Sequence, residues 1–230
     1  RTGVSRRTIN EIVSGKAALS AETALGLERA LGISASFWMR MEATYRARLA
    51  GESASSREGG WEAWADEFPI KEMTRYGYFG ERSSEGSVID RLLKFFGVSS
   101  PQSWKAIWGQ RNACFRQSKT VSVSLHAISA WLRMGEIAAE GVRTKAFSEK
   151  AFRNALTSCR RLTTSSPTVF VPKLQNICAA VGVVVVFVPE LPRTGVYGAT
   201  RWMSADRALI QLSLRGKRDD QLWFSFFHEA

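Results

Sequence analysis

The stretch GVSRRTINEIVSGK, residues 3–16, carries the start and stop signals of one short helix. Ser5 is a good N-cap, because its side-chain oxygen can accept hydrogen bonds from free backbone N–H groups of the first turn. Val4 and Ile9 have the spacing of a hydrophobic staple, which fixes the direction in which the chain enters a helix. Gly15 can adopt the left-handed conformation that ends a helix. The sequence therefore predicts a helix between Ser5 and Gly15.

The predicted helix has two faces of different chemistry. Ile9, Ile12 and Val13 form one apolar stripe, which is expected to pack inward. The remaining surface is polar and suits the major groove, because Arg can pair with guanine, Asn with adenine and hydroxyl groups with phosphate. Gly3 stands where the tight turn of a helix-turn-helix belongs. The side chains expected to contact DNA are Ser5, Arg6, Arg7, Thr8, Asn10, Ser14 and Lys16.

Two more helices are expected directly after this one. Ser20 is placed to cap a helix that runs to Leu31 and is closed by Gly32. A third helix is predicted over residues 36–49, and its apolar positions should pack inward: Phe37, Trp38, Met41 and Tyr45. A generic three-helix cluster with a solvated polar face is the alternative to a DNA-binding unit.

Specific residues of this region resemble a known family. Residues 3–16, followed by Thr23-Ala24-Leu25, Ala30-Leu31-Gly32 and Phe37-Trp38, resemble HigA-type antitoxins, which are repressors of the XRE helix-turn-helix class. The resemblance covers nearly all of residues 1–50. It implies a homodimer on palindromic operator DNA and, in many members, a cognate toxin as protein partner. The first helices of that class are missing, so DNA binding is expected of a longer, full-length protein.

Composition agrees with a folded protein that has a polyanionic partner. Lys and Arg number 32 against 21 Asp and Glu, which gives a net charge of +11. Many basic proteins bind no nucleic acid, so the position of the charges matters more than their total. Hydrophobic residues make up 45% of the chain and include eight Trp, which argues against disorder.

No segment suits a membrane or an oxidising compartment. The longest apolar run, residues 181–188, is too short to cross a bilayer, so no membrane partner is expected. Cys114, Cys159 and Cys178 are an odd number without C-x-x-C spacing, which suits reduced thiols and predicts a cytoplasmic protein.

Residues 51–60 are small and polar and are predicted to form a linker to a helical middle region, residues 61–170. Its tryptophans lie at helical spacing, which is far more typical of a core than of base stacking. His126 has no Cys, Asp or second His at ligand spacing and is expected to be packed or at the surface. Helices are predicted near residues 61–67, 87–96, 102–115, 122–140 and 147–162.

Residues 171–230 are predicted to form a small three-stranded sheet with flanking helices. Pro172 should start a helix, and the valine run 183–188 should be an interior strand. Further strands are expected at 196–203 and 208–214, before a last helix capped by Asp219 or Asp220. The fold class is therefore α+β, mostly α.

The chain ends with Phe226-Phe227-His228-Glu229-Ala230, which matches the first half of an H-E-x-x-H zinc-peptidase helix. Together with Gly198-Ala199-Thr200-Arg201-Trp202 and the strand at residues 208–213, it resembles ImmA/IrrE-type metallopeptidases. That resemblance implies that His228 is a zinc ligand and Glu229 the catalytic acid/base. The second histidine would follow four positions after His228, beyond the last residue, and one imidazole cannot hold zinc. Zinc is therefore expected in a full-length protein and not in these 230 residues; a chance His-Glu pair is the alternative.

Three functions remain open at this point. The chain is a DNA-binding antitoxin whose C-terminal part senses a partner, a zinc endopeptidase that cleaves a regulatory protein, or a scaffold with a decayed enzyme site. Both ends of the chain look trimmed, since it begins inside one motif and stops inside another.

Overall fold

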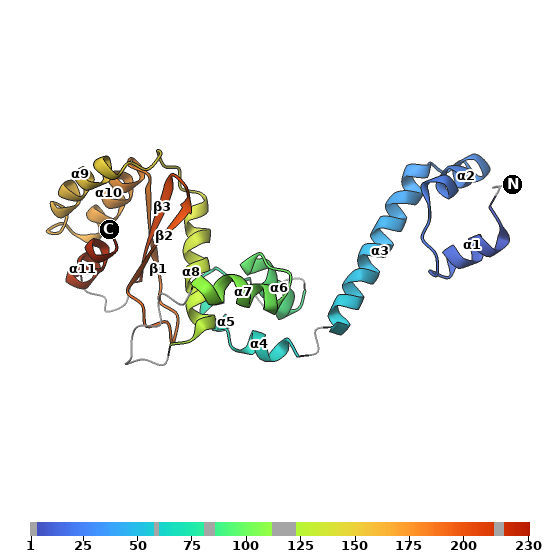
Figure 1. The fold of residues 1–230 in the computed structure, drawn as a ribbon, viewed down its shortest axis with the longest axis horizontal. Coiled ribbons are helices and arrows are strands. Elements are labelled where there is room, and N and C mark those ends of the chain that lie inside the picture. The colour runs from blue at the N-terminus through green and yellow to red at the C-terminus, as the bar shows by residue number, and fades with distance from the viewer. Residues whose placement is uncertain (1–3, 58–59, 81–85, 112–122, 214–218) are drawn as a thin grey trace. The chain divides into compact units, whose positions relative to one another are not determined.

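The computed structural model describes residues 4–57, 60–80, 86–111, 123–213 and 219–230 (Figure 1). The chain divides into two compact units, which we call unit 1, Arg1–Gly60, and unit 2, Trp61–Ala230. The described residues are mostly helical, with one small three-stranded sheet near the C-terminus. The predicted α+β fold class is confirmed.

Unit 1 consists of α1 (Arg6–Val13), α2 (Ala21–Leu31) and α3 (Ala35–Arg57). Both predicted N-caps are present, because the side chains of Ser5 and Ser20 accept hydrogen bonds from the backbone N–H groups of Thr8 and Thr23. Gly32 closes α2 in the left-handed conformation, with a φ of 72°.

Helix α3 is longer than the sequence analysis predicted. It continues to Arg57, where a linker was expected from residue 51. Residues 51–57 contain no proline, and a single glycine inside a helix costs only about 1 kcal/mol. The helix is therefore not forced to end at Gly51.

Unit 2 contains eight helices among the described residues, together with the sheet. The helices are α4 (Glu62–Asp66), α5 (Ile70–Arg75), α6 (Val88–Phe96), α7 (Pro101–Arg111), α8 (Leu125–Glu140), α9 (Glu149–Arg160), α10 (Pro167–Ala179) and α11 (Asp219–Glu229). The strands are β1 (Val183–Val188), β2 (Gly198–Ser204) and β3 (Arg207–Ser213).

The strand order β1-β3-β2 corrects the expectation that the valine run is an interior strand. Strand β3 lies in the middle, parallel to β1 and antiparallel to β2. Strand β1 is apolar because α8 and α10 pack on its two faces, so burial does not require a strand on each side (Figure 1). Side chains also bond its backbone: Gln175 donates to the carbonyl of Val185, and the Trp131 indole donates to that of Val188.

The sheet separates two apolar cores. On the α8 side, Trp104, Trp108 and Trp131 are buried, which confirms that these tryptophans form a core. That core joins α4–α8 to β1 and β3, so the middle region and the sheet pack as one body, without the division near residue 170 that the sequence suggested. The other core lies under α9, α10 and α11 and includes Phe226.

Helix α10 begins earlier than predicted. Pro167 occupies its first turn and Ser166 is the N-cap, while Pro172 lies inside the helix. Proline removes one backbone donor there, but the buried side chains of Phe170, Leu174 and Cys178 hold the helix against the sheet. No helix in the described ranges is long and apolar enough to cross a membrane.

Candidate functional site

Helix α1 and the residues that flank it present the polar side chains that were expected to contact DNA. Ser5, Arg6, Arg7, Asn10, Ser14 and Lys16 are exposed, and Thr8 is half-buried. No side chain of α1 is fully buried. The helix is therefore accessible along its polar side, as a major-groove reader must be, while each contact with DNA stays a prediction.

The two ends of α1 are fixed by local hydrogen bonds. The Ser5 hydroxyl caps the backbone N–H of Thr8 at 3.1 Å and lies 2.8 Å from the Thr8 hydroxyl. Gly15 follows the helix with a φ of 72°, and a Cβ there would collide with the hydroxyl of Tyr45. The positive φ favours glycine at this turn, whereas the Tyr45 side chain could move away from a larger residue.

One of the two arginines of α1 is held by a neighbour. Arg7 is paired through its Nε with Glu11, one turn later, at 2.9 Å, and its side chain is 86% exposed. An exposed pair of this kind adds little stability. The pair orients the Arg7 side chain. Because the guanidinium is held at Nε, both of its terminal amino groups can still donate to a base edge.

The apolar side of α1 lies over an open groove. Ile9 and Ile12 line it together with Trp38, Met41 and Tyr45 of α3, and its volume is about 460 Å³. Val13 was expected to pack inward with Ile9 and Ile12, but it is 81% exposed. That expectation was wrong for Val13, because it is the last helical residue and lies at the rim of the groove.

The second candidate site, His228-Glu229, lies at the end of α11. Trp223 and Phe226 are buried and anchor this helix. Thr200 of β2 donates from its hydroxyl to the carbonyl of Glu229 at 2.8 Å. The Glu229 side chain lies so close to Gly198 that a Cβ there would stand 2.8 Å from Glu229 Cγ. Helix α11 therefore places Glu229 against β2.

The residues present do not fit a zinc ion by themselves. His228 is exposed and its ring stacks on Phe224, with 6.1 Å between ring centroids. Within the described ranges, no group of three His, Cys, Asp or Glu side chains could hold a metal. Zinc in proteins takes three or four protein ligands, so His228 alone does not make a zinc site.

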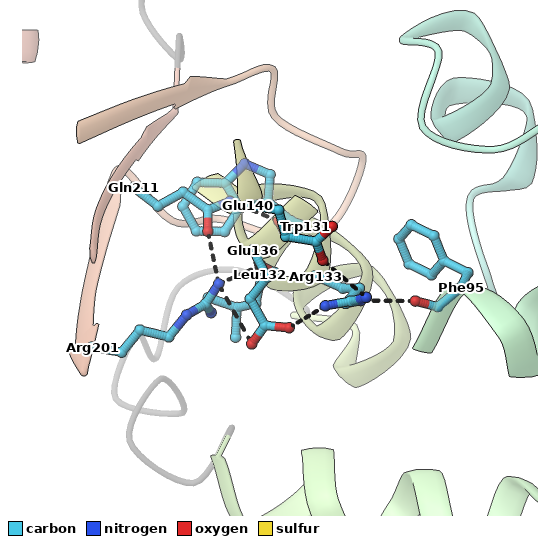
Figure 2. Close-up of polar contacts among 8 residues, drawn as sticks. All are labelled: Phe95, Trp131, Leu132, Arg133, Glu136, Glu140, Arg201 and Gln211. Carbon is cyan, nitrogen blue, oxygen red and sulfur yellow. Dashed lines mark hydrogen bonds and ion pairs between the residues drawn. The ribbon is translucent and has the colours of Figure 1, made fainter. Parts of the chain in front are cut away.

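A polar cluster that the sequence analysis missed lies between α8 and the sheet (Figure 2). Arg201 of β2 donates to the carbonyl of Leu132 and lies 3.8 Å from Glu136. Glu136 accepts from Arg133 at 2.9 Å, and Arg133 also donates to the carbonyl of Phe95, the penultimate residue of α6. Glu140 lies 3.5 Å from the Arg133 guanidinium, so two glutamates balance the two arginines. The cluster fastens α8 to β2 and α6 and is structural.

His126 is packed against aromatic rings. This is one of the two environments that the sequence predicted for it. Its ring stacks on Trp104, with centroids 4.6 Å apart, and meets the edge of Phe68. Its Nδ1 lies 3.5 Å from Glu67. Burial lowers the pKa of His126, Glu67 opposes that shift and Arg193 adds to it.

Comparison with known proteins bears on unit 1. Residues 1–38 match the model of a helix-turn-helix family, and the match is of XRE type. No curated protein and no solved structure matches the chain. The match covers α1, α2 and the start of α3, and it supports a DNA-binding regulator of XRE type.

Proposed function

We propose that this protein is a transcriptional regulator that binds operator DNA through α1 and acts as the antitoxin of a toxin–antitoxin pair. The observation that carries the proposal is the exposed polar side of a capped helix inside a segment that matches a helix-turn-helix model. The predicted contacts are Arg7 and Asn10 to bases, and Ser5, Arg6, Thr8, Ser14 and Lys16 to phosphates or neighbouring base edges.

The proposal includes a homodimer. Helix-turn-helix repressors read two half-sites one helical turn apart, which requires two copies related by a two-fold axis. Phe37, Met41 and Tyr45 of α3 were expected to pack inward, but they are 41%, 54% and 40% exposed. They offer apolar surface for such a contact. A dimer by light scattering at micromolar concentration is expected, and a monomer at that concentration argues against this part of the proposal.

In vitro selection from a random duplex library tests the DNA-binding function. The expected result is enrichment of a palindrome whose half-sites lie about 10 base pairs apart. If no sequence is enriched, the proposal that this protein binds operator DNA is contradicted. The toxin is tested by expressing the neighbouring reading frame, which should arrest growth alone and not when co-expressed with this protein.

Proteolysis is a second candidate function, and one local observation favours it: α11 ends in His228-Glu229 with Glu229 held against β2. In a full-length protein, zinc would be bound by His228 and ligands outside these 230 residues, and Glu229 would serve as proton shuttle. Elemental analysis of the full-length protein tests this. Zinc that is lost in His228→Ala and kept in Glu229→Gln supports the metal site, whereas a zinc-free protein contradicts it.

A further inference from the structure

Basic residues are concentrated in one part of unit 2. Residues 141–189 contain seven Lys or Arg and a single acidic residue, whereas the whole chain has 32 basic and 21 acidic residues. The acidic residue is Glu149. The basic residues, all exposed, are Arg143, Lys145, Lys150, Arg153, Arg160, Arg161 and Lys173. Nearly the whole charge excess of this segment therefore faces solvent.

Helix α9 places much of this charge on one face. Phe152 and Cys159 are buried against the rest of unit 2. Lys150, Arg153 and Arg160 are spaced three and seven residues apart, which puts them on one side of a helix. These three residues form a basic stripe about 15 Å long. Over that length one DNA strand presents about four phosphates.

Most of these charges form no ion pair with the described residues. Arg153 pairs with Glu149 at 2.8 Å, and the Arg160 guanidinium lies 5.9 Å from the ring centroid of Phe227. Lys150, Arg161 and Lys173 form no ion pair with any residue that the structure describes. Uncompensated like charge opposes folding, and a bound polyanion removes that cost.

The surroundings of the stripe also suit phosphate. The segment between α9 and α10 is rich in hydroxyl groups, which donate readily to phosphate oxygens: Thr163, Thr164, Ser165 and Ser166. The exposed face of α9 has Asn154 and Thr157 between its basic residues and lacks the large apolar side chains that anchor interfacial helices in lipid.

We propose that the exposed face of α9, together with its C-cap residue Arg161 and Lys173 of α10, is a second nucleic-acid surface that binds the phosphate backbone of duplex DNA without reading its sequence. DNA is favoured over an acidic protein because a helix-turn-helix in the same chain raises the local concentration of DNA phosphates near unit 2. The proposal goes beyond operator recognition, because this surface contacts any duplex.

The test removes three charges that form no ion pair with a described residue, in the triple variant Lys150→Gln, Arg161→Gln, Lys173→Gln of the full chain. A matched control removes the same number of exposed charges from α5, α6 and α7: Lys71→Gln, Lys94→Gln, Lys105→Gln. Fluorescence anisotropy with an unrelated 30-base-pair duplex gives log Kd against log salt concentration. The triple variant should reduce the slope by about 2 to 3, because each phosphate contact contributes about 0.9, while the control should leave it unchanged.

Other outcomes decide against the proposal. Equal slopes for the two triple variants would overturn it, since net charge alone would then explain the binding. A variant that keeps its DNA affinity but no longer binds vesicles of phosphatidylcholine and phosphatidylserine would assign the surface to membranes. The conservative variant Lys150→Arg, Lys173→Arg should keep the slope. Arg7→Ala should weaken operator binding alone, so failure of this inference and failure of operator recognition are distinguishable.

Discussion

Gly135 of α8 lies directly against the carboxamide of Gln211 in β3, and a Cβ at position 135 would overlap its Oε1, Cδ and Nε2 atoms. Gln211 is fully buried, and its Nε2 donates to the carbonyl of Trp131 at 2.6 Å. Its Oε1 lies 3.4 Å from the guanidinium of Arg201 (Figure 2). The missing side chain at Gly135 therefore makes room for the polar cluster that joins α8 to the sheet.

Gly135→Ala should destabilise the protein by about 2 kcal/mol, because the new methyl group forces Gln211 away from its buried hydrogen bond. Urea unfolding followed by tryptophan fluorescence measures the change. Gly141→Ala is the matched control, since Gly141 follows the same helix and a Cβ there would meet nothing within 4 Å. A Gly135→Ala protein as stable as the Gly141→Ala protein would show that the carboxamide moves at no cost.

His126 should make stability depend on pH near neutrality. Burial beside Trp104 and Phe68 lowers its pKa in the folded protein, so the unfolded chain binds the proton more tightly. The stabilising contribution is complete above the unfolded pKa of about 6.5 and is lost as the pH falls toward the lower folded pKa. The urea midpoint should therefore fall as the pH is lowered from about 7 through the unfolded pKa of about 6.5.

His126→Phe should flatten this dependence, because it keeps an aromatic ring on Trp104 and removes the titrating group. Glu67 and Arg193 are the charged groups that act on His126, so both stay in place in the variant. His228→Gln, which removes the chain's other histidine, is the matched control, and it should keep the pH dependence of stability. An unchanged pH dependence in His126→Phe would assign the titration to another group.

Local signals in the sequence predicted local structure well. Ser5, Ser20 and Gly32 are at their predicted caps, because a cap depends on hydrogen bonds within one turn. Short helix α5 was missed. Its six residues are too few to show the helical repeat of apolar positions. Met73 is buried, so tertiary packing holds this helix.

Features that depend on distant pairing could not be predicted. The valine run of β1 reads as an interior strand, but strand order is set by which segments pair, and β3 lies between β1 and β2. The contact of Arg201 with α8 joins residues 69 positions apart, and no spacing in the sequence indicates it. In the candidate site, the exposed polar side of α1 could be predicted from the spacing of its apolar residues. The exposure of Val13 could not, because it depends on how other parts of the chain pack at the groove.

Glu11 should act on DNA through Arg7. If the carboxylate orients the guanidinium, Glu11→Ala lowers operator affinity in the wild-type protein and has no such effect when Arg7 is already Ala. Binding to a scrambled duplex should instead strengthen, because an acidic side chain near phosphates is removed. A double-mutant cycle by fluorescence anisotropy measures the coupling between the two residues. Additive losses at the operator would mean that each residue acts alone.

The most direct test of the account is operator binding by Arg7→Ala beside Arg40→Ala, on the sequence recovered by selection. Both arginines are exposed in unit 1 and each substitution removes one positive charge, but Arg7 lies on α1 and Arg40 on α3. If α1 reads the major groove, Arg7→Ala costs about 1 to 3 kcal/mol at the operator and relaxes the preference for one base in each half-site. Arg40→Ala should keep that preference. Equal affinity and unchanged base preference in Arg7→Ala, and likewise in Asn10→Ala, would contradict recognition by α1.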